Sequence, residues 1–380
     1  MAREPLRRVR VAAAGREALA WAEGLDVHVP VSLLDAGALG PYVDGGVLTL
    51  PADTSSLTAR FDAAARELRE RAAFTPVPPT SSRLPFSYRA VPTNLRMAIA
   101  RIIGRRQRRR QHEWAAFPGW PLDLSADLFA DLAAAAAPRP ASTATPVVLT
   151  HDLDSPEGLR NLVERFLPLE EAAGARSTSY IVPRAWPLDE GLLQAVVARG
   201  HELGIHGFDH ANRTPFAPAS ERRQRLQAAS PLIERYAMTG YRAPSLLRTR
   251  ELLDDVAPLY RYDSSIPTAG GLFPVPNNGN ATARPYRIGS LVELPLSLPR
   301  DGSLQFLGYT PEQSADLWMQ CADRIARARG VAVLLTHCED HFSGGARALA
   351  AYRSFLDRVS ADRRFIWARA ADVAAPFAHA

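Results

Sequence analysis

What the chain lacks excludes several classes of protein. Lysine is absent, so every basic residue counted among the 45 is an arginine, and with the abundant alanine this indicates GC-rich codon usage rather than a binding function. Cys321 and Cys338 are too few for a disulfide-stabilised secreted fold, so both are predicted to be reduced, apolar side chains. No segment approaches the roughly 20 apolar residues of a membrane helix, and charged residues interrupt every candidate secretory signal near the N-terminus.

What is present is the composition of a folded protein with a modest positive charge. Apolar residues make up 47% and charged residues 22% of the chain, enough for a large buried core. The formal net charge of +5 favours an anionic or phosphate-bearing partner, but it does not predict nucleic-acid binding. Because 380 residues exceed one average domain, we expect a large α/β unit with a smaller attachment.

The predicted elements divide the chain into three regions. Residues 1–75 form a small N-terminal α/β layer, with strands at 8–14, 27–33 and 46–50 and helices at 16–23 and 55–73. Residues 76–140 are irregular or helical, begin and end with linker-like composition, and are expected to pack on the third region. Residues 141–380 repeat strand and helix.

Short apolar strands alternate with helices throughout the third region. The predicted strands are 147–150, 177–182, 202–205, 240–242, 259–262, 291–296, 331–336 and 364–368. The predicted helices are 158–173, 189–199, 219–237, 248–256, 311–329 and 346–359. This alternation indicates a parallel sheet covered by helices. Seven or eight such units predict a (β/α)7–8 barrel, complete or incomplete.

Titratable side chains gather where these strands end. In chain order they are Asp152, Asp154, His206, His210, Arg242, Asp263, Glu293 and His337. The carboxyl ends of barrel strands converge on one face, where barrel enzymes carry their active sites. We therefore predict that these side chains form a single site.

His206 and His210 are the strongest candidates for metal ligands. One helical turn apart, they can face a single ion, and Asp154 at a neighbouring strand end can supply a third ligand. Three protein ligands leave a coordination position for water, as a hydrolytic metal site requires. Asp152 lies two residues from Asp154 on an extended strand, faces the same side, and is predicted to be the general base.

Each of these residues also has a structural interpretation. A histidine pair at this spacing arises by chance, and Asp152 or Asp154 could cap the following helix. His337 could be a hydrogen-bonded core residue, and Arg242 could be an ion-pair partner. For a purely structural explanation, all of these separate roles would have to occur together at the ends of several strands. A shared functional site is therefore the favoured interpretation.

Four motifs in the third region resemble those of the NodB-type polysaccharide deacetylases, carbohydrate esterase family 4. The first motif corresponds to Thr150-His151-Asp152-Leu153-Asp154, in the spaced Asp-x-Asp form of a divergent branch. The others correspond to His206-Gly207-Phe208-Asp209-His210, Arg242-Ala243-Pro244 and Leu334-Leu335-Thr336-His337. The first 140 residues do not share the resemblance.

The resemblance implies a metal-dependent hydrolase that removes an acetyl or formyl group from the nitrogen of a sugar. Asp154, His206 and His210 would hold one divalent ion, with Zn²⁺ as the first choice and Co²⁺, Ni²⁺ or Mn²⁺ as alternatives. Asp152 would accept a proton from water, and His337 would protonate the departing amine.

Other residues are expected to support these roles. Arg242 is predicted to lie against Asp152 and keep the pKa of that carboxyl low. Asp263 or Glu293 is predicted to orient His337.

Several further residues have two open interpretations. Pro244 and Trp120 are predicted to contact substrate, although Trp120 could instead pack between regions. The basic segment Arg101–Arg110 could lie on anionic lipid as an amphipathic helix or form a solvated face. His151 and His341 could be additional ligands, but side chains beside strand ends often face the outer layer.

The family's substrates range from extracellular polysaccharides to nucleotide- or lipid-linked sugars inside the cell. Because no secretory signal is recognisable, we expect the second group and a cytoplasmic enzyme, at the inner face of the membrane, in cell-envelope or surface-polysaccharide metabolism. Two alternatives stay open: a C–N hydrolase of a small non-sugar amide or ureide, and an inactive barrel that binds saccharide. The filled ligand and base positions favour an enzyme, and the oligomeric state is not predicted.

Overall fold

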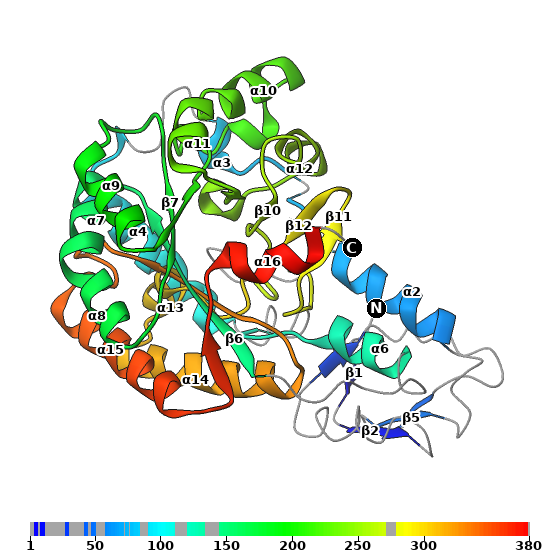
Figure 1. Ribbon diagram of the computed structural model, residues 1–380. Coiled ribbons are helices and arrows are strands. Elements are labelled where there is room, and N and C mark those ends of the chain that lie inside the picture. The colour runs from blue at the N-terminus through cyan, green and yellow to red at the C-terminus, as the bar shows by residue number, and fades with distance from the viewer. Residues whose placement is uncertain are drawn as a thin grey trace.

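The computed structural model describes most of the barrel and part of the N-terminal regions (Figure 1). The described residues are 58–71, 73–75, 77–83, 90–110, 120–133, 144–270 and 279–378, with five short strands before them. Those strands are β1 (Glu4–Leu6), β2 (Arg8–Val11), β3 (Val27–Val29), β4 (Tyr42–Asp44) and β5 (Val47–Leu50).

A curved sheet of nine strands forms the centre of the third region. Its strands are β6 (Thr145–Leu153), β7 (Thr178–Ile181), β8 (Glu202–Ile205), β9 (Gly240–Tyr241), β10 (Tyr262–Asp263), β11 (Tyr286–Ile288), β12 (Leu291–Glu293), β13 (Ala332–His337) and β14 (Phe365–Trp367). Their order is β11-β12-β10-β9-β8-β7-β6-β13, with β14 also pairing with β6. All neighbours are parallel except β11 and β12. Each of the eight predicted strands overlaps an observed one, although the strand predicted at 259–262 shares only Tyr262 with β10, and β11 was not predicted.

The barrel is nearly closed between β12 and β13. The segment after β12 runs along β13, where the Leu298 amide donates to the Val333 carbonyl over 3.0 Å. The Val333 amide in turn donates to the Ser297 hydroxyl over 2.8 Å. A side-chain oxygen thus replaces one ladder acceptor, and the fold is the predicted incomplete (β/α) barrel.

Helices surround the outer face of this sheet (Figure 1). They are α7 (Pro156–Asn161), α8 (Leu167–Ala172), α9 (Glu190–Ala198), α10 (Ala219–Gln227), α11 (Ser230–Tyr236), α12 (Arg250–Val256), α13 (Asp301–Leu307), α14 (Pro311–Arg327) and α15 (Ala346–Ala361). A π-helical turn at Leu162–Phe166 joins α7 to α8. The single helix predicted at 219–237 is two helices, because Pro231 lacks the amide that would continue the first.

The alternation of side chains along β6 separates two apolar layers. Leu149 and Leu153 face outward and pack in the large cluster beneath the surrounding helices. Val148 faces inward and belongs to a second cluster that fills the barrel. Helix α16 (Ala370–Ala378), which crosses the barrel in Figure 1, contributes Ala370 to that inner cluster. The amino end of the barrel is thereby filled, and only the carboxyl end offers room for a site.

The helices that precede the barrel are α2 (Thr58–Arg71), α3 (Thr80–Arg83), α4 (Thr93–Arg109) and α6 (Ser125–Ala133). Strands and a helix are present at the N-terminus as predicted, whereas the predicted helix at 16–23 and all but the first residue of the linker predicted at 133–140 lie outside the described residues. The proposed division into three regions stays a prediction. Among the described helices, none combines the length and apolar character needed to cross a bilayer.

Candidate active site

The carboxyl ends of the strands line one cavity of about 610 Å³. One side of the cavity is polar and includes Asp152, Asp154, His206, His210, His337 and Glu339. The other side is apolar and includes Met97, Ile99, Ala100, Ile103, Phe306 and Phe342. Five of the predicted site residues are therefore together in one cavity.

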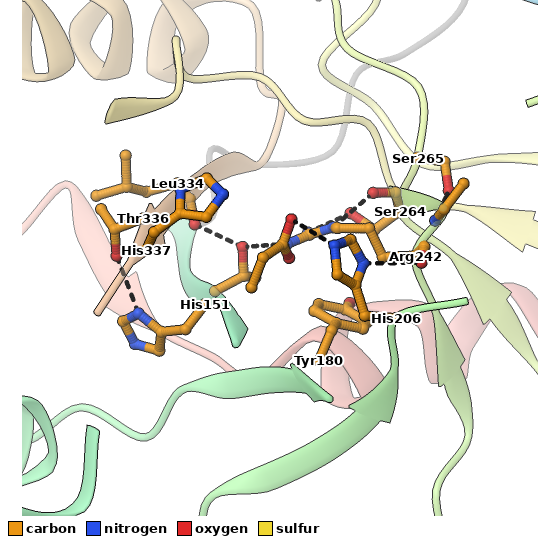
Figure 2. A network of polar contacts seen from close by, with 12 residues as sticks. His151, Tyr180, His206, Arg242, Ser264, Ser265, Leu334, Thr336 and His337 are labelled. Atoms are coloured by element: carbon orange, nitrogen blue, oxygen red, sulfur yellow. Dashed lines mark hydrogen bonds and ion pairs between the residues drawn. The ribbon is translucent and has the colours of Figure 1, made fainter. Parts of the chain in front are cut away.

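His206, which follows β8, is held in the orientation of a metal ligand. Its Nδ1 lies 3.0 Å from the Arg242 carbonyl oxygen, a contact that requires the proton on Nδ1 (Figure 2). In the neutral ring the lone pair is consequently on Nε2, which is buried and has no hydrogen-bond partner in the described structure. A buried nitrogen in this state is well suited to bind a cation.

His210 reaches the same point from a loop, so the predicted helical turn between the two histidines is wrong. Residues 207–213 form no helix, and both Gly207 and His210 have positive φ angles, of 66° and 57°. A Cβ atom at Gly207 would also lie 2.5 Å from the Pro244 ring. Glycine is therefore needed where this loop turns past Pro244 and brings the second imidazole back toward the first.

Asp154, His206 and His210 have the separations of ligands to one ion. The donor atoms of the three residues all lie within 4.8 Å of one another. Asp154 Oδ1 is 3.2 Å from His210 Nε2 and 3.7 Å from His206 Nε2. Two donors each about 2.0–2.1 Å from a tetrahedral Zn²⁺ lie about 3.4 Å apart, so the nitrogen and oxygen set fits such an ion.

Asp152 lies at the edge of this group and is held ionised. Its Oδ2 is 3.5 Å from His206 Nε2, and its Oδ1 accepts a hydrogen bond from Arg242 Nη1 over 3.0 Å. Burial alone would raise the pKa of Asp152, but His206, Arg242 and His337 outweigh burial and lower it. The predicted contact between Arg242 and Asp152 is present.

Arg242 is fully buried and fixed in one position (Figure 2). Its Nε donates to the Ser264 carbonyl over 2.8 Å, and its Nη2 donates to the Ser264 hydroxyl over 2.9 Å. Nη1 also donates to the Thr150 hydroxyl, and the guanidinium lies over the Tyr180 ring, 4.1 Å from its centroid. The charge that faces Asp152 therefore cannot turn toward solvent.

His337, at the end of β13, is oriented by Asp301. His337 Nδ1 and Asp301 Oδ1 are 2.8 Å apart, and the other carboxylate oxygen accepts the His337 amide over 2.7 Å and the Ser343 hydroxyl over 2.8 Å. Burial would lower the pKa of His337, but the Asp301 carboxylate, with more distant acidic groups, raises it to about 9. The imidazole thus carries its proton at neutral pH.

Asp263 and Glu293 do not orient His337, which corrects the sequence prediction. They are paired across β10 and β12 and face outward, because the neighbouring Tyr262 and Val292 belong to the inner cluster. Asp263 accepts hydrogen bonds from the Ser265 amide and hydroxyl. Burial raises the pKa of both carboxyl groups, and their proximity raises that of Glu293 further.

Glu339, two residues after His337, is a further site residue that the sequence analysis left without a role. Its Oε1 accepts hydrogen bonds from the Asp154 amide over 3.1 Å and from the Ser155 hydroxyl over 2.8 Å. Burial and the nearby Asp154 carboxylate raise the pKa of Glu339. Ser155, whose hydroxyl accepts from the Gly158 amide, caps α7, so neither predicted aspartate fills that capping role.

The remaining predicted site residues lie outside the metal-ligand group. Trp120 and Pro244 do not line the cavity among the described residues, and Trp120 packs against Tyr309 at 5.9 Å between ring centroids. His151 faces the outer layer, as its structural interpretation predicted, and contacts Glu170. His341 lines the cavity and stacks on Phe342, but it is not part of the three-residue group.

Comparisons with known proteins agree with this fold. A polysaccharide deacetylase from Mycobacterium smegmatis is 22% identical, with a TM-score of 0.51 over 63% of this chain and 92% of its own. The Puue allantoinase is 14% identical, with a TM-score of 0.50 over 67% and 96% of the two chains. No curated protein sequence matches the chain significantly.

A family match covers part of the sequence. Residues 140–259 match the family described as polysaccharide deacetylase. That segment contains the motifs of Asp152, Asp154, His206 and His210, which line the cavity, and of Arg242, which donates to Asp152. The family match therefore covers the first half of the barrel, where these motifs lie.

Proposed function

We propose that the protein is a metal-dependent hydrolase that removes an acetyl or formyl group from the amino nitrogen of a saccharide. The proposal rests on one observation: the buried Nε2 atom of His206 has no hydrogen-bond partner among the described residues and faces Asp154 and Asp152 at the polar side of the cavity. A binding protein has no need to leave a buried nitrogen without a partner beside two carboxylates.

Asp154, His206 and His210 would hold the ion, with Zn²⁺ favoured and Co²⁺, Ni²⁺ or Mn²⁺ as alternatives. Such an ion, when bound, polarises a carbonyl oxygen and lowers the pKa of water to near 7. The Nδ1–H bond of His206 to the Arg242 carbonyl fixes the ring so that its lone pair meets the ion.

Asp152 and His337 divide the proton transfers between them. Asp152, ionised because its pKa is lowered, accepts the proton of the attacking water. The acyl C–N bond then breaks, and the leaving nitrogen takes a proton from His337, whose raised pKa keeps that proton in place. Arg242 and Asp301 hold these two groups in position.

We further propose that the saccharide belongs to cell-envelope or surface-polysaccharide metabolism and that the enzyme is cytoplasmic. Hydrolysis of a small ureide, suggested by the fold shared with an allantoinase, is the second candidate. The apolar side of the cavity, with Met97, Ile103 and Phe306, disfavours so small and polar a molecule.

The test measures acetate and formate release from a panel of N-acyl hexosamines and compares it with hydrolysis of cyclic ureides. Protein stripped by chelator, then supplied with Zn²⁺, should release acid from at least one N-acyl sugar and should be inactive before metal is added. Turnover of ureides alone would establish the second candidate. Failure to bind Zn²⁺ would instead favour an inactive saccharide-binding barrel.

A further inference from the structure

Helix α4 carries exposed apolar side chains that the hydrolytic site does not require. Leu95, Ile99, Ile102 and Ile103 are 52%, 47%, 66% and 41% exposed, and we call them the α4 strip. Their spacing of four, three and one residues places them along one side of the helix. A helix face that only met water would not carry four large aliphatic residues in this arrangement.

Arginines border the α4 strip. Arg101, Arg105 and Arg109 follow one another at intervals of four residues and are all exposed. No acidic side chain in the described parts of the chain forms an ion pair with them. The first turn of α4 also contains no acidic residue. The combination of an aliphatic strip with a row of cations is that of a helix lying on an anionic bilayer.

The α4 strip continues into the active-site cavity. Ile99 and Ile103 belong to the strip and also line the cavity, where Met97 and Phe306 extend the apolar wall. Gly104 lets α4 approach α13 closely, since a Cβ atom there would overlap the Phe306 carbonyl. Apolar residues shared by the α4 strip and the cavity therefore connect the outside of the helix with the cavity that contains Asp154 and the two histidines.

We propose that the α4 strip docks on an anionic phospholipid bilayer and that the substrate is a lipid-linked N-acylated saccharide. The lipid chain would pass along Ile99 and Ile103, while the sugar would reach Asp154 and the two histidines. The substrate part of this inference rests on the proposed function, whereas the docking part does not. A free or nucleotide-linked sugar has no apolar portion to occupy this wall.

Vesicle sedimentation tests the docking. The full-length protein should pellet with vesicles of phosphatidylcholine mixed with phosphatidylglycerol, and much less with phosphatidylcholine alone. Because each arginine near an anionic surface strengthens binding about fivefold, Arg101→Gln with Arg105→Gln should weaken it about 25-fold. Ile102→Glu, which removes an apolar contact outside the cavity, should also reduce binding, while circular dichroism confirms that the variants fold.

The matched control is Arg327→Gln with Arg363→Gln. Both arginines are exposed, and they precede β13 and β14 at the opposite end of the barrel. This control removes the same charge, so it should sediment like the unaltered protein. Absence of binding by the unaltered protein, or an equal loss in the control, would overturn the docking surface.

Kinetics test the substrate. kcat/KM for an N-acetylhexosamine carried on a polyprenyl phosphate should exceed those for the free sugar and its nucleotide-linked form, and Ile103→Glu should raise KM more for the lipid-linked compound than for the other two. Ile102→Glu should leave turnover of the free sugar unchanged. Equal use of all three compounds would overturn the lipid-linked substrate but not the proposed function. Vesicle binding without release of acid from any sugar would overturn the proposed function and leave the docking surface standing.

Discussion

Strand β6 separates two clusters of histidine and carboxylate side chains that differ in what they can bind. On its inner face, Asp152 lies beside His206 in the site cluster. On its outer face, His151 lies beside Glu170 and His201 in the outer cluster. The two clusters contain the same types of side chain, and adjacent residues of one strand belong to each.

In the outer cluster every ring nitrogen has a partner. His151 contacts Thr336 and Glu170, and His201 accepts from the Ser177 amide and contacts Glu171. In the site cluster, by contrast, His206 Nε2 has no hydrogen-bond partner in the described structure and the group borders the cavity. An imidazole nitrogen without a hydrogen-bond partner, together with access to a cavity, distinguishes the candidate metal site from the structural polar core, whereas residue types do not.

Of the substitutions in the two clusters, His206→Ala should lower metal content and activity the most. His206→Ala deletes one of three ligands, so we expect metal content below about a tenth of an equivalent and activity at background. The loss should exceed the roughly 10- to 100-fold cost typical of changing a ligand's outer partner. Metal analysis of the purified variant, beside its hydrolysis rate, decides the point; a variant that kept a full equivalent would show that the ion is held elsewhere.

The two aspartates of the site cluster should separate metal binding from turnover. Asp152→Asn should retain the ion and lower kcat about 10²- to 10⁴-fold, because the group that accepts the proton is lost. Asp154→Asn should lose the ion, since its carboxylate is the one grouped with both imidazoles. Metal content and kcat are measured on both variants, and the opposite outcome would exchange the two roles.

The strands and the ligands could be predicted because local patterns specify them. Apolar runs with β-branched residues located seven of the eight predicted strands well and the strand predicted at 259–262 only at its last residue. Parallel strands bring their carboxyl ends together whatever the helices between them. The direction of Asp263 was also accessible from the sequence. It lies between Tyr262 and Ser264, so strict alternation along β10 puts it on the face opposite to theirs.

Asp301 and the position of α4 could not be predicted from local patterns. Asp301 approaches His337 only because the chain leaves β12, runs beside β13 and then starts α13. Likewise, the sequence showed a basic and apolar segment around Arg101–Arg110, but not that Ile99 and Ile103 border the cavity. Both facts depend on contacts between segments distant in the chain.

Asp301 should control the pH dependence of the reaction. Because it raises the pKa of His337 to about 9, His337 stays protonated until the pH passes that value, and activity should then fall. Asp301→Asn should lower the pKa of His337, move the alkaline limb of the kcat profile to lower pH, and reduce kcat by about 10- to 100-fold. If the alkaline limb of the kcat profile did not move in Asp301→Asn, His337 would not be the group that donates the proton.

The His337–Asp301 pair should also make the stability of the metal-free protein depend on pH. A histidine whose pKa is raised on folding stabilises the fold fully below its ordinary value of 6.5, and this contribution is lost as the pH rises through about 9. NMR titration of His337 in metal-free protein measures the pKa directly. Denaturation at several pH values should show a smaller loss of stability over this range for Asp301→Asn.

Substitutions in the outer cluster should lower the stability of the protein without changing its metal content or kcat. His151→Ala leaves the fully buried Glu170 carboxylate with fewer partners, so the free energy of unfolding should fall by about 3 kcal/mol. His151→Gln, which can still donate to Glu170, should recover part of that loss. Metal content and kcat of the folded fraction should equal those of the unaltered protein, in contrast to His206→Ala. If His151→Ala instead lost the ion at unchanged stability, the two faces of β6 would not be functionally separate, and an unpartnered imidazole nitrogen would not mark the metal site of this barrel.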